Sequence, residues 1–398
     1  MRRATWLEIL PRDPLVFRDG RPFSAFPGAK VRGFPFPMPQ TLAGAVRGRI
    51  GEARGYEPGE ERWDGLKKEV AVHGPLLFDR KSGEVLIPAP LDAVFMKKEE
   101  NRNPRLFRLK PALPPSGILW NMPEGLAPLM GDLPEGKPEP MPNFWRWERY
   151  EQWLLENIDS EEEIAPHELG IAKLPREYRT HVKIDTRTST AEESMLFETE
   201  GLVFLYNPSE NGEKGLSAAR ELGLLARVEA EDLPLAALSG FRPLGGERRL
   251  AAWVWRGEEI AIPKPPERLI QAVRQTKRAR LILATPAYFD SDPPYLPPME
   301  PDHVFTLAGL RVKLIAVAVG RPVTVSGWDL LKESPKPSRR LVPAGSVYFI
   351  ELLGDPGTEA IKEWVEALWL RPLPGQPQED QNNGFGLTLL GAWTPEKE

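Results

Sequence analysis

The glycine-rich segment QNNGFGLTLLGAW excludes the nucleotide-binding folds in which such segments usually occur. It runs from Gln381 to Trp393. A P-loop needs a lysine and then Ser or Thr directly after its glycines, whereas Leu387 and Thr388 follow Gly386. A dinucleotide fingerprint opens a βαβ unit of about 30 residues, but the sequence ends at Glu398, so too little chain follows. The segment therefore matches no known phosphate-binding motif, and only the backbone conformations that its glycines permit are left to interpret.

Two interpretations of this loop stay open. Asn382, Asn383, Gly384 and Gly386 tolerate positive φ and can form a ledge without side chains. Such a ledge can present N–H groups to a phosphate or let a nucleic-acid strand pass closely, with Phe385 stacked on a base. The alternative is a plain turn into a strand, in which Phe385 fills the core.

Length and apolar content predict two domains without a membrane span. At 398 residues with 41% apolar residues, the chain exceeds the usual size of one hydrophobic core. No run of about 18 apolar residues occurs, and Glu8 and Pro11 interrupt any signal-peptide core. We therefore expect a cytoplasmic protein.

The titratable residues argue against metal, cofactor and thiol chemistry. There is no cysteine, so disulfides, thiolate nucleophiles and Cys-ligated metals are excluded. The histidines stand at 73, 167, 181 and 303, too far apart for a familiar metal-ligand spacing. The net charge of −5 argues against a protein that coats nucleic acid by bulk charge, although a local basic groove is compatible with it.

Strand and helix patterns alternate along the chain and predict an α+β protein, for which ferredoxin-like units are the simplest plan. A strand pattern covers residues 5–17, and a helix with an apolar face begins near Thr41. A second unit begins at 279–289 and contains an amphipathic helix with Ile361, Trp364, Val365 and Leu368 on one face. The predicted domains are 1–275 and 276–398, with the largest insertion at 97–165.

Two helices have unusual surfaces. Gly44, Gly48, Gly51 and Gly55 form a stripe along the first helix, and each interior glycine costs about 1 kcal/mol relative to alanine. The stripe favours close packing on a sheet or, alternatively, contact with a polymer backbone or partner. The aromatic helix at 145–158 suggests a subunit interface, because free monomers seldom expose such patches.

Five segments, taken together, resemble one known family. They are FRDGRPF, TLAGAVR, LGGERR, VPAGSVYF and GFGLTLLG, at Phe17–Phe23, Thr41–Arg47, Leu244–Arg249, Val342–Phe349 and Gly384–Gly391. In this order and spacing they are similar to the third subunit of the Cmr complex, a RAMP protein of the type III-B CRISPR–Cas effector. The resemblance spans nearly the whole chain, and the insertion at 97–165 is the part that does not align.

The resemblance implies two ferredoxin-like, RRM-related domains with long insertions. It also implies a non-catalytic subunit that binds the 5′ repeat-derived tag of the guide RNA. The implied protein partners are the large polymerase-like subunit and the RNA-coating backbone subunits.

With the resemblance, cations on loops become candidate RNA contacts, because phosphates are often held by cations beside flexible backbone. The predicted RNA-binding residues are Arg18, Arg21, Arg47, Arg49, His181, Lys183, Arg187, Arg248, Arg249, Lys336, Arg339, Arg340, Gly384, Phe385 and Gly386.

Two other functions compete with tag binding. A metal-independent guide-processing endoribonuclease would need a general acid and base, for which His181 is the candidate. No second group that completes a catalytic set is evident near it in the sequence. A purely architectural subunit would touch RNA only incidentally.

Overall fold

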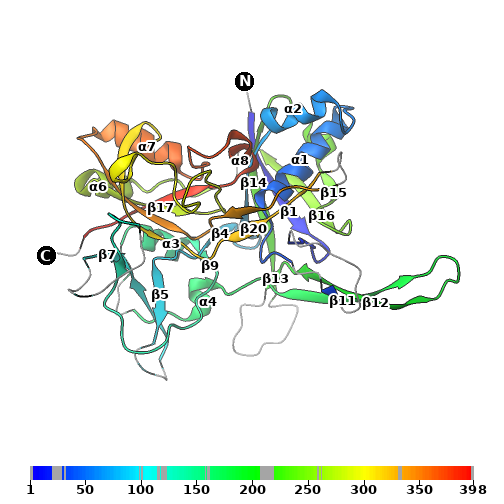
Figure 1. Ribbon diagram of the computed structural model, residues 1–398, viewed down its shortest axis with the longest axis horizontal. Coiled ribbons are helices and arrows are strands. Elements are labelled where there is room, and N and C mark those ends of the chain that lie inside the picture. The colour runs from blue at the N-terminus through cyan, green and yellow to red at the C-terminus, as the bar shows by residue number, and fades with distance from the viewer. Residues whose placement is uncertain are drawn as a thin grey trace. The chain divides into compact units, whose positions relative to one another are not determined.

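The computed structural model describes residues 3–19, 29–30, 33–97, 99, 102–113, 117, 123–156, 158, 162–206, 219–257, 260, 262–329 and 334–395. The chain divides into two compact units, each built from three separate stretches of sequence (Figure 1). Unit 1 contains residues 1–82, 174–260 and 324–340, and unit 2 contains residues 83–173, 261–323 and 341–398.

Unit 1 is built on an antiparallel sheet with the strand order β3-β14-β1-β16-β15. These strands are β3 (Ala71–Asp79), β14 (Arg220–Ala230), β1 (Arg3–Pro11), β16 (Leu250–Gly257) and β15 (Gly240–Pro243), and β13 (Leu205–Tyr206) pairs with β14. In the central strand, Leu7 and Ile9 are fully buried and pair with Ala226 and Leu224 of β14. Glu8 and Leu10, on the opposite face, are buried as well, so both faces of this strand are covered over residues 7–10.

Helix α1 (Pro39–Ala53) packs on β3 and contacts α2 (Glu61–Glu69) and α5 (Leu235–Leu238). Its buried face contains Leu42, Val46 and Ile50, as the sequence pattern predicts. Close packing explains one glycine of the stripe, because a Cβ on Gly51 would lie 2.6 Å from the Trp63 ring. No described atom lies within 4 Å of a Cβ built on Gly44 or Gly48, so close packing does not explain these two.

A long two-stranded ribbon also belongs to unit 1 (Figure 1). Strand β11 (Arg176–Ile184) pairs with β12 (Ala191–Leu202), and β2 (Ala29–Lys30) adds to β12 in parallel. The structure also contains two short two-stranded sheets. One pairs β20 (Val323–Val325) with β23 (Arg339–Leu341), and the other pairs β21 (Trp328–Asp329) with β22 (Ser334–Pro335).

Unit 2 contains a five-stranded antiparallel sheet with the order β18-β19-β24-β17-β25. The strands are β18 (Val304–Leu307), β19 (Leu310–Ala318), β24 (Val347–Leu352), β17 (Arg278–Leu283) and β25 (Thr388–Ala392). The helical elements of this part are α6 (Glu267–Thr276), the 3-10 turn η2 (Pro301–His303), α7 (Thr358–Leu368) and α8 (Gln378–Asn383). The four apolar residues predicted for one face of α7 are all buried, which confirms that helix.

The stretch 83–173 completes unit 2 with short antiparallel pairs and two helices. The elements are β4 (Glu84–Pro88), β5 (Ala93–Met96), β6 (Arg105–Arg108), β7 (Lys110–Pro111), β8 (Leu129–Met130), β9 (Phe144–Arg146), α3 (Trp147–Leu154), α4 (Pro166–Leu169) and β10 (Gly170–Ile171). Several antiparallel sheets with few helices make this an α+β protein, as the pattern predicts. The number of ferredoxin-like domains and the domain boundary at 275/276 stay predictions.

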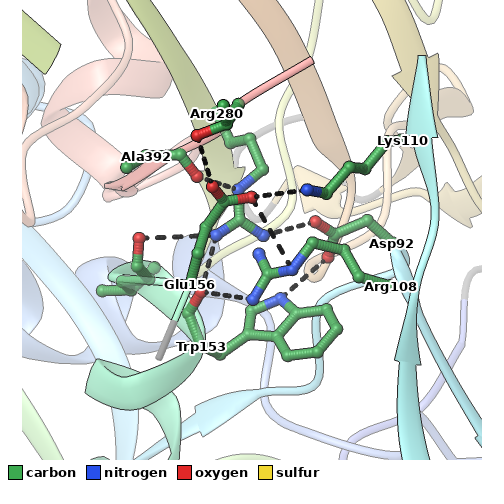
Figure 2. Close-up of polar contacts among 9 residues, drawn as sticks. Asp92, Arg108, Lys110, Trp153, Glu156, Arg280 and Ala392 are labelled. Carbon is green, nitrogen blue, oxygen red and sulfur yellow. Dashed lines mark hydrogen bonds and ion pairs between the residues drawn. The ribbon is translucent and has the colours of Figure 1, made fainter. Parts of the chain in front are cut away.

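A buried ionic network joins the expected insertion to the sheet of unit 2 (Figure 2). Arg280 of β17 and Asp92, both fully buried, form an ion pair with 2.5 Å between Nη1 and Oδ2. Arg280 also donates to the carbonyls of Trp153 and Ala392, at 2.6 and 2.8 Å, and the Trp153 indole donates to Asp92 at 3.0 Å. These contacts join Asp92 and Trp153 to strands β17 and β25 within the core of unit 2.

Arg108 lies at the edge of this network. Its guanidinium donates to the Trp153 carbonyl at 2.8 Å and its carbon lies 3.7 Å from the centre of the indole ring. Burial, followed by the charge of Arg280, lowers the pKa of Arg108 to about 9. The network therefore holds two buried guanidinium groups near one another. The Asp92 carboxylate neutralises the charge of Arg280, and the Glu156 carboxylate neutralises that of Arg108.

The structure does not support the subunit interface suggested for the aromatic helix. Trp145, Tyr150 and Trp153 are at most 1% exposed, and Trp145 makes edge contacts with the other two rings. The fourth aromatic, Trp147, is half-buried and contacts the rings of Tyr150 and Trp369 within unit 2. The interpretation of 145–158 is corrected accordingly: three of its aromatics fill the core of unit 2 and the fourth packs against rings of the same unit.

Replacing Asp92 with alanine should destabilise unit 2 strongly. The variant leaves the Arg280 guanidinium buried without its carboxylate, which costs about 3–5 kcal/mol for a buried pair. The measurement is the urea midpoint of the full chain, followed by tryptophan fluorescence. Asp355→Ala is the matched control, since this exposed aspartate pairs with Lys277 at the surface and its removal should leave the midpoint unchanged. Equal midpoints for D92A and wild type would contradict a structural role for the network.

His73 makes stability depend on pH. Burial in β3, followed by the charge of Arg227, lowers its pKa to about 4 from the ordinary 6.5, and outweighs Glu229, whose carboxylate lies 3.8 Å away. Between these two values the unfolded chain binds a proton that the folded chain does not, so stability falls as pH drops from about 6.5 to about 4. Urea midpoints at pH 7.5 and pH 5 should therefore differ less in His73→Gln than in wild type. Identical pH dependence in both proteins would exclude His73 as the source.

Candidate nucleic-acid interface

A pocket of about 430 Å³ in unit 1 brings together three of the sequence segments singled out above. Phe17 and Arg18 come from the chain after β1, Thr41 from the first turn of α1, and Gly245 and Arg248 from the turn between β15 and β16. More than 200 residues separate the first of these segments from the last. The pocket is therefore a product of the tertiary fold.

Backbone contacts hold the walls of this pocket. The N–H of Gly246 donates to the carbonyl of Val16 at 2.7 Å, and the two residues form an isolated antiparallel bridge. Gly245 has φ of 78°, and a Cβ there would lie 2.5 Å from the Val16 oxygen and 3.0 Å from the Phe17 ring. Only glycine fits at this position, because both the dihedral angle and the close approach exclude a side chain.

The same turn contains backbone strain. Glu247 and Arg248 follow the glycines with φ of 61° and 52°, in the left-handed region that ordinary residues rarely occupy. Each such residue costs about 1 kcal/mol or more, and strained residues concentrate at ligand-binding and active sites. The strained turn places Arg248 in the wall of the pocket.

The lining of the pocket combines an apolar floor with two cations. Val16 and Phe17 are buried, and Ala45 and Pro243 continue the apolar surface. Arg18 and Arg248 are exposed arginines in the same lining, and Thr41 adds a hydroxyl group. No acidic side chain lines the pocket among the residues that the structure describes. Such a lining suits a ligand with a flat apolar part and a negative charge.

The predicted basic run of 181–187 lies on the β11–β12 ribbon. His181 stacks on Phe197, with ring centroids 5.1 Å apart, and its Nε2 is 2.8 Å from the Thr199 hydroxyl. Lys183 is exposed and pairs with Glu192 at 2.7 Å. Arg187 is exposed in the turn that joins the two strands.

The remaining predicted cations differ in how they are used. Arg49 pairs with Glu52 one turn along α1. Arg249 pairs with Glu247, with 3.7 Å between Nη2 and Oε2. Three cations precede or form β23: Lys336 and Arg340 are exposed, and Arg339 is half-buried. Arg21 lies outside the described residues.

The prediction of an RNA contact at Arg47 is wrong for this structure. The side chain is only 8% exposed, and its Nε and Nη2 both donate to the carbonyl of Val70, at 3.1 and 2.9 Å. Arg47 thus satisfies the backbone at the end of α2. Its guanidinium faces the protein because α1 turns that side towards α2 and β3.

The RNA ledge predicted at the terminal glycine loop is also contradicted. Phe385 is fully buried, so its ring fills the core and cannot stack on a base. The N–H groups of Gly384, Phe385 and Gly386 donate to backbone carbonyls at 3.0, 3.1 and 2.7 Å, leaving none of the three for a phosphate. Gly384 ends α8 in the left-handed conformation, and this explains the glycine there.

Sequence reasoning did not select the apolar floor of the pocket. Val16, Phe17, Thr41 and Ala45 line it, yet only the neighbouring arginines were proposed as contacts. The available signal was that Phe17 and Thr41 belong to two separate segments that resemble one family. Two segments that resemble one family indicate a common site only when the tertiary structure shows that they lie next to each other.

Two further searches concern metals and membranes. Among the described residues, no group of three or more His, Cys, Asp or Glu side chains is arranged to hold a metal ion. Within the same part of the chain, the helices are too short or too polar to span a bilayer.

The α+β architecture agrees with the class expected from the sequence, and a family model identifies the chain more specifically. Residues 7–393 match the family described as "CRISPR-associated protein (Cas_Cmr3)". This chain therefore belongs to the Cmr3 family of CRISPR-associated proteins, which confirms the resemblance found in the five segments. No curated protein is significantly similar to it in sequence.

Several solved structures resemble the chain at low sequence identity. A chain of the type III-B Cmr-β complex bound to cognate target RNA and AMPPnP has 15% identity and a TM-score of 0.44, with 86% of each chain covered. A chain of the same complex bound to cognate target RNA has 14% identity, 86% coverage of each chain and a TM-score of 0.47. A chain of the Csm3–Csm4 subcomplex of the type III-A interference complex has 12% identity and a TM-score of 0.38, with 98% of this chain and 100% of that chain covered.

Gly245→Ala should destabilise the wall of the pocket, and Gly44→Ala should have the opposite effect. The methyl group at 245 meets the Val16 carbonyl and requires positive φ, which costs about 1–3 kcal/mol. The methyl group at 44 meets open space on a helix, where alanine is favoured by up to about 1 kcal/mol. Urea midpoints of the two variants should move in opposite directions from wild type; a G245A midpoint at or above the wild-type value would contradict the geometry.

Proposed function

We propose that this protein is a non-catalytic RNA-binding subunit of a type III-B CRISPR effector complex, and that it holds the 5′ repeat-derived tag of the guide RNA. One observation supports this most directly. Three of the five segments that resemble the Cmr3 family meet at one pocket in unit 1, and Arg18 and Arg248 line that pocket.

The lining of the pocket fits single-stranded RNA. Unpaired RNA is held by cations along its backbone and by contacts to splayed bases. The exposed arginines suit the first kind of contact, and the apolar surface of Ala45 and Pro243 suits the second. Because the protein is acidic overall, this local arrangement rather than net charge would attract the RNA.

The β11–β12 ribbon adds further cations and an apolar face. Lys183 and Arg187 are exposed towards its tip. On one face, Val182 and Leu196 pair directly across the strands, and Tyr178 shares that face at 60% exposure. Isolated proteins rarely present such apolar surface without a partner. It supports a role for this chain in bridging the large polymerase-like subunit and the backbone subunits.

A charge-reversal experiment tests the tag-binding role. Arg18→Glu combined with Arg248→Glu should weaken binding of tag-bearing RNA. It should also make the slope of log affinity against log salt shallower by about 0.7 for each phosphate that the protein no longer neutralises. Fluorescence anisotropy at several salt concentrations, with the full chain, measures both quantities.

The control reverses an exposed arginine that belongs to unit 2. Arg311→Glu changes the net charge in the same direction but removes only a surface pair with Glu300, so its effect on RNA affinity should be small. If the double reversal at Arg18 and Arg248 behaves like the control, tag binding at the pocket is wrong.

A further inference from the structure

The β11–β12 ribbon and the β15–β16 turn are held by the same short piece of chain. Residues 14–17, called here the connecting segment, follow β1 and form backbone bridges to both of them. Leu15, Val16 and Phe17 are at most 4% exposed. The base of the ribbon and the turn that carries Arg248 thus contact one buried segment.

Successive residues of the connecting segment bond to opposite sides. Leu15 exchanges two backbone hydrogen bonds with Leu202 at the end of β12, at 2.9 and 2.8 Å. The carbonyl of the next residue, Val16, accepts the N–H of Gly246 in the turn at 2.7 Å. This is the bonding of a central strand, because peptide groups of neighbouring residues in an extended chain point in opposite directions. One residue step of backbone therefore separates the ribbon contact from the turn contact.

The ribbon side of the connecting segment is closely packed. A Cβ built on Gly201 would lie 2.9 Å from the Cβ of Pro14 and 3.4 Å from its carbonyl oxygen. The proline ring cannot rotate away as a long side chain could, so the backbone on one side would have to move. Glycine at 201 thus allows β12 to approach the connecting segment.

The turn side cannot absorb such a movement without losing hydrogen bonds. A shift of the connecting segment would separate the buried Val16 carbonyl from the Gly246 N–H, and an unpaired buried backbone group is costly. Asp13, directly before the segment, also accepts the N–H of Leu250 at 2.8 Å, just after the turn. A displacement at the base of the ribbon is therefore passed on to the turn.

We infer that the connecting segment couples the base of the ribbon to the β15–β16 turn, so that Gly201 and Leu202 are positioning residues for Arg248, although neither lines the pocket. A constraint on the ribbon then strengthens RNA binding at the turn, and RNA at the turn stiffens the ribbon by the same factor, because coupling between two sites is reciprocal. The RNA part of this inference rests on the proposed function, whereas the coupling itself does not.

Hydrogen exchange of the free, full-length protein tests the coupling without RNA. In Gly201→Ala the methyl group meets Pro14, so the amides of residues 244–249 should exchange about 2- to 30-fold faster than in wild type, the usual range for coupling of this kind. Strand β24 (Val347–Leu352) of unit 2 should exchange at the wild-type rate in the same sample. Mass spectrometry of short peptides measures both rates.

Two further variants complete this experiment. Leu196→Ala is the matched control, because it changes an exposed residue further along β12, and exchange at 244–249 should stay at the wild-type rate. The reverse variant, Gly245→Ala, strains the turn and should speed exchange at residues 200–204 at the base of the ribbon. It carries the test alone if Gly201→Ala does not fold.

The same variants are then measured with tag-bearing RNA. Gly201→Ala should lower the affinity by about 2- to 30-fold, and Leu196→Ala should leave it unchanged. In wild type, bound RNA should slow exchange at residues 200–204, although these residues lie outside the pocket lining.

The outcomes separate the coupling from the function on which its RNA part rests. Wild-type exchange at 244–249 in Gly201→Ala, or faster exchange there that β24 shows equally, overturns the coupling. Coupling in the free protein, with no preference of wild type for tag-bearing RNA, overturns the proposed function and leaves the coupling intact. A Gly201→Ala variant with faster exchange at the turn but wild-type RNA affinity overturns the role of Gly201 in positioning Arg248 for RNA.

Discussion

The backbone bridge between Val16 and Gly246 is the contact on which the candidate site depends. It holds the turn between two sheet strands against the chain that leaves β1, at a distance that leaves no room for a Cβ on Gly245. The turn then continues through two residues with left-handed dihedral angles, and one of these is Arg248. A close backbone approach thus fixes the place of a cation more firmly than a flexible loop could.

The arginines of this acidic protein divide into buried ones that hold the fold and exposed ones that face solvent. Arg47 and Arg280 are buried and donate to backbone carbonyls, and Arg280 also pairs with Asp92. Arg18 and Arg248 are exposed and line an apolar pocket. Because the sequence contains more acids than bases, the proposed RNA binding depends on where a few arginines lie rather than on how many there are.

The two corrections at the candidate site share a physical cause. The glycine loop at 384–386 and the arginine at 47 were both selected because flexible backbone and positive charge attract phosphates. In the fold, neighbouring backbone groups use the N–H donors of both: carbonyls accept from the loop, and Val70 accepts from Arg47. Donors near glycine are available to a ligand only when the fold leaves them unpaired, and sequence does not record this.

Sequence alone determined the α+β class, the amphipathic helix at 358–368 and membership of the Cmr3 family, since periodicity and ordered motifs are local properties of the chain. It also indicated Arg18 and Arg248 as candidate contacts. Only the tertiary structure decided that these two arginines share one pocket, that Phe17 and Ala45 form its floor, and that Phe385 and Arg47 face inward. The physical reason is that burial and proximity arise from long-range strand pairing and packing, which join segments hundreds of residues apart.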